Sequence, residues 1–202
     1  MTATLDHDTD LPAVTDPRAL RDAFGQFPSG VVAVAGRVDE SLVGIAASSF
    51  TSVSLDPPLV SLCVATSSST WPRLRAAGQL GVSVLAEDQD AVCRQLAGPA
   101  ERRFDGLALS AAPGGAVLLD DAVSTFTCTI HSEVEAGDHL VVLLELHSHS
   151  DGRGREPLIF HRSGFARLHR EQPEIPLSGR INGEPVHETA GPGGGSAEDD
   201  AA

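Results

Sequence analysis

Residues 44–71 read Gly-Ile-Ala-Ala-Ser-Ser-Phe-Thr-Ser-Val-Ser-Leu-Asp-Pro-Pro-Leu-Val-Ser-Leu-Cys-Val-Ala-Thr-Ser-Ser-Ser-Thr-Trp. Two loops of small and hydroxyl residues, 47–51 and 66–70, flank an apolar segment in this stretch. The apolar segment, residues 59–65, follows two prolines and ends at the serines, which is typical of a buried strand. We therefore expect a buried strand between two hydroxyl-rich loops.

The second loop consists entirely of hydroxyl residues and runs directly into Trp71-Pro72 and a helical pattern. Such a loop can direct N–H and O–H donors at a phosphate, assisted by the positive end of the helix that follows. A first loop suited to a polar ring edge and a second loop suited to a phosphate together predict a nucleotide-like cofactor. The alternative is that these serines and threonines only cap the helix and fill turns.

Composition excludes several kinds of partner. The chain has 202 residues, enough for one domain with tails, and its 41% hydrophobic content is ordinary for a soluble globular protein. The formal net charge of −14 argues against nucleic acid and against anionic membrane surfaces as partners. No apolar run approaches the roughly 20 residues that cross a bilayer. The acidic, polar N-terminus is not a signal peptide, so we expect a cytoplasmic protein.

The three cysteines are far apart and show no Cys-x-x-Cys or zinc-type spacing. Cys63 and Cys128 lie in apolar runs, so we expect both side chains in the core. An odd number of isolated cysteines fits a reducing compartment.

Composition also divides the chain into three parts. We expect residues 1–16 to be a flexible N-terminal segment and residues 17–170 to form the folded domain. Residues 171–202 are an acidic tail rich in Gly and Pro. Such a tail cannot bury enough apolar surface to offset its chain entropy, so it is predicted to be mostly disordered.

Two helices have recognisable starts. Asp16-Pro17 is typical of an N-cap followed by a first-turn proline, and apolar side chains recur with helical spacing from Leu20 to Phe27. Asp88 should cap a second helix that runs through Leu96. A short helix should follow the second hydroxyl loop.

Strand-like patterns cover most of the remaining domain. The segments are 31–38, 42–47, 59–65, 80–85, 116–119, 123–131, 139–147, 157–160 and 164–168. Many short strands with two or three brief helices predict a mainly β protein and favour a β-barrel. Residues 140–144 are apolar on both faces, so this strand should be central or covered by a partner subunit.

Several motifs follow one another along the domain. They are Phe27-Pro28-Ser29-Gly30-Val31, the stretch from Gly44 to Leu62 with its core from Ser49 to Val60, the hydroxyls Ser68 and Thr70 with Trp71, Arg103-Phe104-Asp105-Gly106, Gly137-Asp138-His139, and Pro157-Leu158-Ile159-Phe160 with Gly164-Phe165. With these motifs in this order, roughly residues 20–168 resemble the short-chain flavin reductase family. Members of that family are the NAD(P)H-dependent components of two-component flavin monooxygenases.

The resemblance implies a split β-barrel of the flavin-reductase, FMN-binding type, which forms a homodimer and binds FMN or FAD near the subunit interface. It also implies hydride transfer from NADH or NADPH to the flavin, and delivery of reduced flavin to a separate flavin-dependent oxygenase. The cofactor carries the difficult chemistry while the protein holds two flat rings face to face. No nucleophile and no pair of catalytic carboxylates is therefore required.

The same resemblance assigns roles along the chain. Residues 47–51 would hydrogen-bond the isoalloxazine edge, residues 63–65 would lie beside the ring and the ribityl chain, and residues 67–70 would hold phosphate. The cofactor-binding residues expected in this way are Ser29, Ala47, Ser48, Ser49, Phe50, Thr51, Cys63, Val64, Ala65, Ser67, Ser68, Ser69, Thr70, Trp71, Phe104 and His139.

His139 is the expected catalytic residue, because the histidine of the Gly-Asp-His motif in relatives lies near the nicotinamide and orients it. From the residues alone, His139 is better explained as a polar strand end whose hydrogen-bonding groups Asp138 satisfies. Trp71 and Phe104 would pack on a ring or an adenine. For Trp71 the alternative is a hydrophobic anchor at the start of the helix.

The phosphate loop departs from the family pattern. Thr66 and Ser69 stand where relatives often carry Lys or Arg. Backbone dipoles, Arg73 or Arg75 would then have to meet the phosphate charge.

Two further departures lie near the expected cofactor. Leu144 stands where relatives usually have a small glycine, and it either narrows the cofactor region or fills the core. Phe160 or Phe165 replaces a tyrosine that is often found in the closing hairpin.

Two other functions fit parts of the sequence. His147-x-His149 would place two imidazoles on one face of a strand, a spacing that metal sites use, so a metal-dependent β-barrel oxygenase is one alternative. The polar run around this pair is, however, typical of a strand that frays into a loop. The other alternative is a non-catalytic flavin-binding module, because a fold alone does not establish chemistry.

Overall fold

A computed structural model describes residues 13–152 and 154–169 of the chain. These residues form a mainly β structure with short helices, which confirms the mainly β part of the expected fold class. Most of the predicted N-terminal segment, and the whole predicted tail from residue 171 onward, lie outside the described residues.

The helices are α1 (Pro17–Phe24), α2 (Trp71–Leu74) and α3 (Asp90–Leu96), and the 3₁₀ turns are η1 (Ala100–Arg102) and η2 (Pro113–Gly115). The strands are β1 (Ser29–Gly30), β2 (Val32–Val38), β3 (Ser41–Ala47), β4 (Thr51–Leu55), β5 (Pro58–Ala65), β6 (Leu80–Val84), β7 (Leu109–Ala111), β8 (Val117–Leu119), β9 (Ser124–Ala136), β10 (His139–Asp151), β11 (Ile159–His161) and β12 (Gly164–Ala166).

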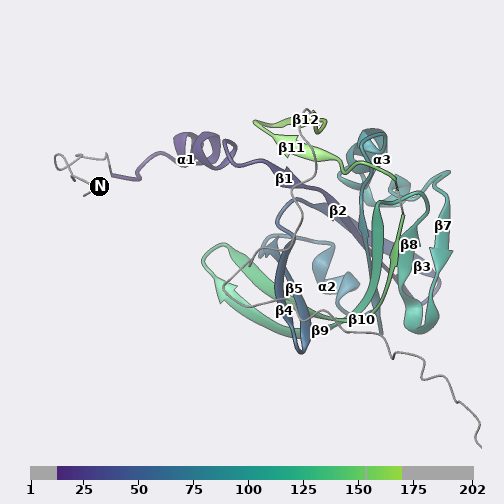
Figure 1. Ribbon diagram of the computed structural model, residues 1–202. Coiled ribbons are helices and arrows are strands. Elements are labelled where there is room, and N and C mark those ends of the chain that lie inside the picture. The colour runs from purple at the N-terminus through teal and green to yellow at the C-terminus, as the bar shows by residue number, and fades with distance from the viewer. Residues whose placement is uncertain (1–12, 153, 170–202) are drawn as a thin grey trace, which may run out of the picture. The chain divides into compact units, whose positions relative to one another are not determined.

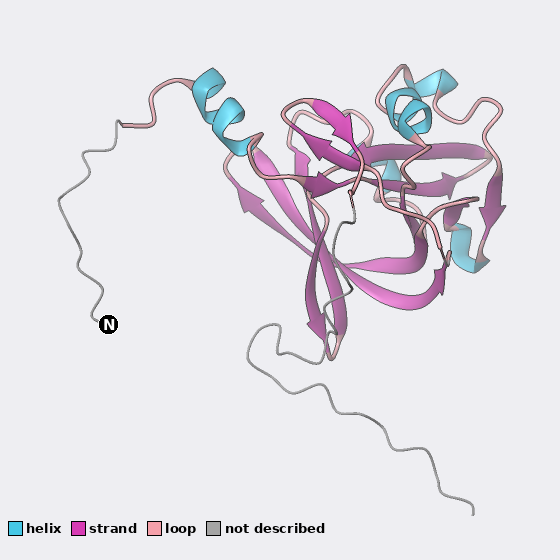
Figure 2. Ribbon diagram, turned by 45° about the horizontal axis from the view of Figure 1, so that its top comes forward, coloured by secondary structure: helices cyan, strands magenta, loops and turns pink. Residues whose placement is uncertain are grey.

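One antiparallel sheet of seven strands forms the body of the domain, in the order β3-β2-β6-β9-β10-β5-β4. The sheet is strongly curved, and α2 lies on its concave side (Figure 1; Figure 2). β10 pairs with β9 on one side and with β5 on the other, so it lies inside the sheet. In segment 140–144, Val142 and Leu144 are fully buried, and the side chains of Leu140, Val141 and Leu143 are partly buried.

The main core lies between this sheet and α2. In β5 the side chains of Val60, Leu62 and Val64 are buried, whereas the Cys63 side chain is exposed. The expectation that Cys63 lies in the core is therefore wrong, because successive side chains of a strand point to opposite faces. Cys128 in β9 is fully buried, as expected.

α1 begins where the sequence predicts, because the Asp16 carboxylate accepts a hydrogen bond from the Arg18 amide at 2.9 Å. The helix ends at Phe24, so Phe27 lies beyond it. No residue of α1 is buried, and the Phe24 and Phe27 side chains are 68% and 78% exposed. Among residues 13–152 and 154–169, none covers the apolar face of α1.

α3 does not begin as predicted. Its N-cap residue is Gln89, whose side-chain oxygen accepts from the Ala86 amide at 2.9 Å and whose Nε2 donates to the Asp120 carbonyl at 3.0 Å. The Asp88 carboxylate instead pairs with Arg155 at 3.1 Å. A local capping pattern cannot reveal this pairing, because the two residues are 67 positions apart.

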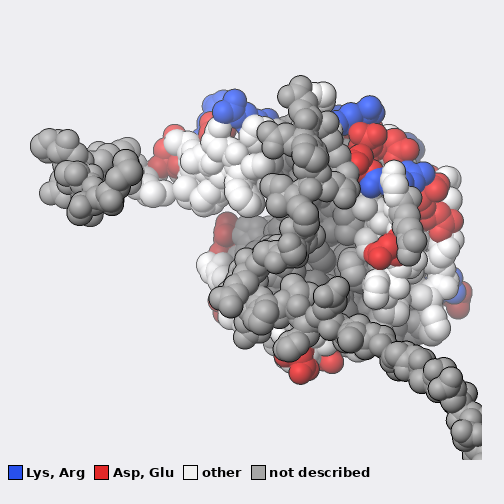
Figure 3. Space-filling model, viewed as in Figure 1, with Lys and Arg blue, Asp and Glu red and all other residues white. Residues whose placement is uncertain are grey.

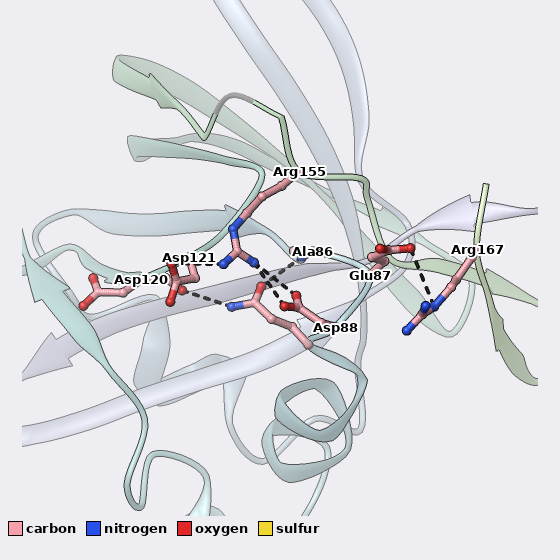
Figure 4. A network of polar contacts seen from close by, with 8 residues as sticks. Ala86, Glu87, Asp88, Asp120, Asp121, Arg155 and Arg167 are labelled. Carbon is pink, nitrogen blue, oxygen red and sulfur yellow. Dashed lines mark hydrogen bonds and ion pairs between the residues drawn. The ribbon is translucent and has the colours of Figure 1, made fainter. Parts of the chain in front are cut away.

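The β11–β12 hairpin is linked at both ends to the segment that leads into α3. Before the hairpin, Arg155 bridges Asp88 and Asp121, each at 3.1 Å. After the hairpin, Arg167 Nε lies 3.6 Å from the Glu87 carboxylate. Figure 4 shows both arginines directed toward this segment. The position of the hairpin therefore depends on contacts between residues far apart in sequence.

Several strands differ from the predicted ones. β9 and β10 extend to Ala136 and Asp151, beyond the predicted ends at residues 131 and 147. Their pairing contains register shifts between 143 and 144 and between 146 and 148, which interrupt the alternation of side chains. β4 and β7 were not predicted, because β4 is rich in hydroxyl residues and β7 has only three residues.

Acidic and basic side chains lie next to each other at the α3 end of the face drawn in Figure 3. No helix within residues 13–152 and 154–169 has the length and apolarity needed to cross a membrane.

Candidate functional site

The first hydroxyl loop is hydrogen-bonded to β5 through Ser49. The Ser49 hydroxyl accepts from the Cys63 amide at 2.8 Å and donates to the Cys63 carbonyl at 3.2 Å. Thr51 begins β4 and pairs with Ser61 of β5. The structure therefore brings the predicted ring-edge loop next to the predicted segment 63–65. Because the Ser49 hydroxyl is already used, the side chains left to meet a ring edge are those of Ser48 and Thr51.

The second loop is hydrogen-bonded to the turn between β9 and β10. Thr66 donates to the Asp138 carbonyl twice, from its amide at 2.9 Å and from its hydroxyl at 3.0 Å. The Ser68 hydroxyl accepts from the Trp71 amide at 3.2 Å, which fixes the path of the loop into α2. The exposed side chains of the loop are those of Thr66, Ser67 and Ser69.

The β9–β10 turn also places His139, which pairs with Ala65 of β5. His139 Nδ1 lies 2.7 Å from Asp138 Oδ1, and since an ionised carboxylate only accepts, the imidazole donates this hydrogen bond. The hydrogen bond and the charge of His139 hold the pKa of the Asp138 carboxyl below its usual range. A neutral His139 ring in this orientation presents Nε2 as an acceptor.

Three predicted residues direct their side chains into the core. Val64 and Trp71 are 4% and 2% exposed, and Phe50 stacks on Phe126 with ring centroids 6.3 Å apart. The side chain of Trp71 is therefore an anchor at the start of α2, which was the alternative to ring stacking. These side chains pack in or against the core and so help to position the two loops.

Thr70 and Phe104 belong to a separate cluster around Arg103. Arg103 Nη1 donates to the Thr70 hydroxyl at 2.9 Å and to the Gly44 carbonyl at 2.8 Å. A Cβ atom at Gly44 would lie 2.7 Å from the Phe104 ring, so the two residues are in close contact. Phe104 lines a cavity of about 440 Å³ together with Arg73, away from the first loop.

A largely apolar cavity of about 300 Å³ opens beside the first loop. Ala47 and Ser48 form one wall, and Phe160 and Phe165 of the β11–β12 hairpin form another. The two phenylalanine rings meet edge to face at 5.7 Å, and the Arg94 guanidinium lies 4.8 Å from the Phe165 ring centre. Apolar walls with a few polar groups suit a flat aromatic ring.

A second cavity, of about 290 Å³, shares Ser48 and Phe160 with the first. It also includes Ser29, together with Phe24 and Phe27 from α1 and the segment after it. Ser29 therefore lines the same cavity as Ser48 of the first loop.

Sequence reasoning missed several residues of these cavities. Cys93 and Arg94 of α3 and Ser163 of the hairpin line the first one. Burial raises the pKa of the Cys93 thiol. No local motif marks these side chains, because α3 and the hairpin reach the first loop only through the fold.

Leu144 is fully buried, opposite Val60 of β5 and Ile130 of β9. The sequence left open whether Leu144 narrows the cofactor region or fills the core. The structure shows that it fills the core.

The alternative of a metal site finds no support in the part of the chain that the structure describes, where no cluster of three or more His, Cys, Asp or Glu side chains is placed to hold a metal ion. His147 and His149 lie within β10, so the predicted fraying is wrong. His147 Nε2 is hydrogen-bonded to the Thr129 hydroxyl at 2.9 Å.

Comparison with known proteins places the chain in a family. Residues 24–169 match the family described as "Flavin reductase like domain". The chain is 37% identical over 151 residues to a flavin reductase from Pseudomonas putida, covering 74% of this chain and 89% of that protein. It is 33% identical over 153 residues to HsaB of Rhodococcus jostii, the reductase subunit of a flavin-dependent monooxygenase, covering 76% of this chain and 78% of that protein.

A solved structure is similar as well. The NADH:FAD oxidoreductase SgcE6 of Streptomyces globisporus, in complex with NAD and FAD fragments, aligns with a TM-score of 0.73 and 35% sequence identity. The alignment covers 79% of this chain and 99% of that chain. The motif order, the fold and these comparisons agree, and the chain belongs to the flavin reductase like domain family.

Proposed function

We propose that this chain catalyses the NAD(P)H-dependent reduction of FMN or FAD by hydride transfer and supplies reduced flavin to a separate monooxygenase. The observation that carries the proposal is that the two hydroxyl loops and His139 converge on the end of β5. The similarity to a flavin reductase and to the reductase subunit of a monooxygenase supports both parts of the proposal.

The residues present fit a flavin nucleotide. The second loop exposes hydroxyl groups and contains no carboxylate, so it suits a phosphate. The first loop borders a largely apolar cavity with two phenylalanine rings, which suits a flat tricyclic ring. We assign ring contacts to Ala47, Ser48 and Thr51, and phosphate contacts to Ser67 and Ser69.

When bound, the flavin accepts a hydride from the nicotinamide. The chain contributes position: holding reacting atoms about 3–3.5 Å apart supplies on the order of 7 kcal/mol. Outward-facing backbone N–H groups of the first loop would stabilise negative charge that develops at the ring edge. The Ser49–Cys63 hydrogen bonds keep that loop at a fixed distance from β5.

His139 orients the nicotinamide in this proposal. Asp138 accepts a hydrogen bond from its Nδ1–H, so Nε2 of the neutral form of the ring is the atom that would accept from the N–H of a carboxamide group. The pairing of His139 with Ala65 sets the imidazole beside the end of β5, where the ring would lie.

We also propose that the domain, residues 17–170, closes as a split β-barrel and acts as a homodimer in the cytoplasm. The strong curvature of the seven-stranded sheet supports the barrel (Figure 1). The uncovered apolar face of α1, with Phe24 and Phe27, supports a second copy as its partner. Three cysteines without disulfide bonds support a reducing compartment.

The test is an oxidation assay at 340 nm with each combination of NADH or NADPH and FMN or FAD. Turnover that requires added flavin is the expected result. Saturable flavin binding without turnover supports the non-catalytic module instead. Absence of both binding and turnover contradicts the proposal altogether.

A further inference from the structure

Glu133 of β9 contacts both ends of the short helix α2. Its Oε1 accepts a hydrogen bond from Trp71 Nε1 at 2.7 Å, and its Oε2 lies 2.6 Å from Arg75 Nη2. Trp71 is the first residue of α2, and Arg75 is its C-cap. The Glu133 side chain is only 15% exposed, so this carboxylate acts in a partly desolvated setting.

The hydroxyl loop ends where α2 begins, so both ends of the loop are attached to the β9–β10 hairpin. At its start, Thr66 donates twice to the Asp138 carbonyl. At its end, Trp71 donates to Glu133. The serines that face a phosphate in our proposal lie between these two attachments.

α2 cannot fix the loop unaided. It has four residues, and its N-cap residue Thr70 makes no side-chain capping hydrogen bond. A helix this short is not stable on its own, because helix nucleation is unfavourable. Its position is therefore set by tertiary contacts, of which the charge-assisted hydrogen bond between Glu133 and Trp71 is one of the strong kinds.

Resting on the proposed function, we propose that Glu133 is a positioning residue for the phosphate loop: through Trp71, it sets the affinity of the loop for the flavin phosphate. Glu133 does not touch the flavin in this account. The Trp71 hydrogen bond matters more than the Arg75 ion pair, because the Arg75 side chain is 50% exposed and such pairs contribute little.

The test compares FMN with riboflavin, which has the same ring and ribityl chain but no phosphate. Dissociation constants are measured by quenching of flavin emission for the wild-type protein, Glu133→Ala, Glu133→Gln, Trp71→Phe, and the double variant Glu133→Ala with Trp71→Phe. The matched control is Glu135→Ala, which removes an exposed carboxylate two residues further along β9.

Glu133→Ala should raise the dissociation constant of FMN about 5- to 20-fold while that of riboflavin changes by less than about 2-fold. Glu133→Gln keeps an acceptor oxygen for Trp71 and should stay within about 3-fold of wild type for FMN. Trp71→Phe should match Glu133→Ala, and the double variant should add little to either. Glu135→Ala should leave both constants unchanged.

Riboflavin binding also reports whether the site for the isoalloxazine ring is still folded in each variant. The positioning role is overturned if Glu133→Ala leaves the ratio of the FMN and riboflavin dissociation constants unchanged, whether both constants rise together or neither changes. Additive effects of Glu133→Ala and Trp71→Phe overturn it too. A wild-type protein that binds FMN no better than riboflavin overturns the phosphate loop itself, and one that binds no flavin overturns the proposed function.

Discussion

His139 combines a sequence motif with a defined orientation. Its imidazole donates to Asp138, and its backbone pairs with Ala65 at the end of β5. His139→Ala should lower kcat/KM for the nicotinamide substrate about 10- to 100-fold, because an orienting contact is lost. Flavin affinity should change little. Steady-state kinetics together with flavin titration measure both quantities.

The matched control for this variant is His149→Ala, which removes an exposed imidazole near the other end of β10. It should leave kcat/KM unchanged. If His139→Ala also leaves kcat/KM unchanged with both NADH and NADPH, then His139 is not part of the site.

The three thiols should differ sharply in reactivity. Cys63 is exposed beside the proposed ring site, whereas burial raises the pKa of Cys128 to about 12. At pH 8, iodoacetamide should therefore modify Cys63 first and leave Cys128 intact until the protein unfolds. Saturating FMN should slow modification of Cys63, as measured by intact-protein mass spectrometry. Equal rates with and without FMN would place the flavin elsewhere.

Single positions show where sequence reasoning reaches its limit. Motifs predicted His139 and the two loops as site residues, because Ser, Thr and His side chains can hydrogen-bond a polar, nucleotide-like ligand. The outward position of Cys63 was predicted wrongly and the inward position of Trp71 was left open, since both depend on which face of β5 or α2 meets the core. Glu133 carries no local signal, because its partner Trp71 is 62 residues away.

β10 gains stability from the buried Leu144. Leu144→Ala should lower the free energy of unfolding by about 2–5 kcal/mol, because it leaves a cavity among buried strands. Urea unfolding measures this change. Leu55→Ala, at a side chain that is 95% exposed, should change stability by less than about 0.5 kcal/mol. A loss below 1 kcal/mol for Leu144→Ala would contradict the core-filling role.

The β11–β12 hairpin should loosen locally when its ionic link is removed. Arg155→Gln breaks the ion pairs with Asp88 and Asp121, which are partly exposed, so overall stability should fall by less than about 1 kcal/mol. The Leu158 amide, which donates to the Leu85 carbonyl at 2.8 Å, should nevertheless exchange its hydrogen several-fold faster. Hydrogen exchange with mass spectrometry detects this change.

Arg18→Gln on α1 is the control for the hairpin, because it removes one arginine from an exposed helix. It should not affect exchange at Leu158. Identical exchange in wild type and Arg155→Gln would show that backbone pairing alone holds the hairpin.

Helices and strands with a strong hydrophobic pattern could be predicted from the sequence, whereas those with a weak hydrophobic pattern could not. The strands around Val34, Leu62 and Val142 are long apolar runs, and each was found close to its observed position. β4 was missed because its hydroxyl residues resemble a loop, although pairing with β5 makes it a strand. The start of α3 was misplaced because Gln89 and Asp88 take partners from distant segments.

The assembly should be a dimer of about 42 kDa, twice the 21.0 kDa of one chain. α1 has an apolar face but buries none of its residues, so a second copy is the proposed cover. The double variant Phe24→Glu with Phe27→Glu should sediment as a monomer in analytical ultracentrifugation. Glu40→Ala, in the exposed turn between β2 and β3, should remain dimeric. A monomeric wild-type protein contradicts this assembly.

The central claim is that this chain brings a nicotinamide and a flavin together for direct hydride transfer. The most direct measurement mixes the protein anaerobically with equimolar FMN and NADH and follows absorbance at about 340 and 450 nm. NADH and oxidised flavin should disappear together, mole for mole, only when the protein is present. Loss of neither species, or loss at the same rate without the protein, would contradict the account.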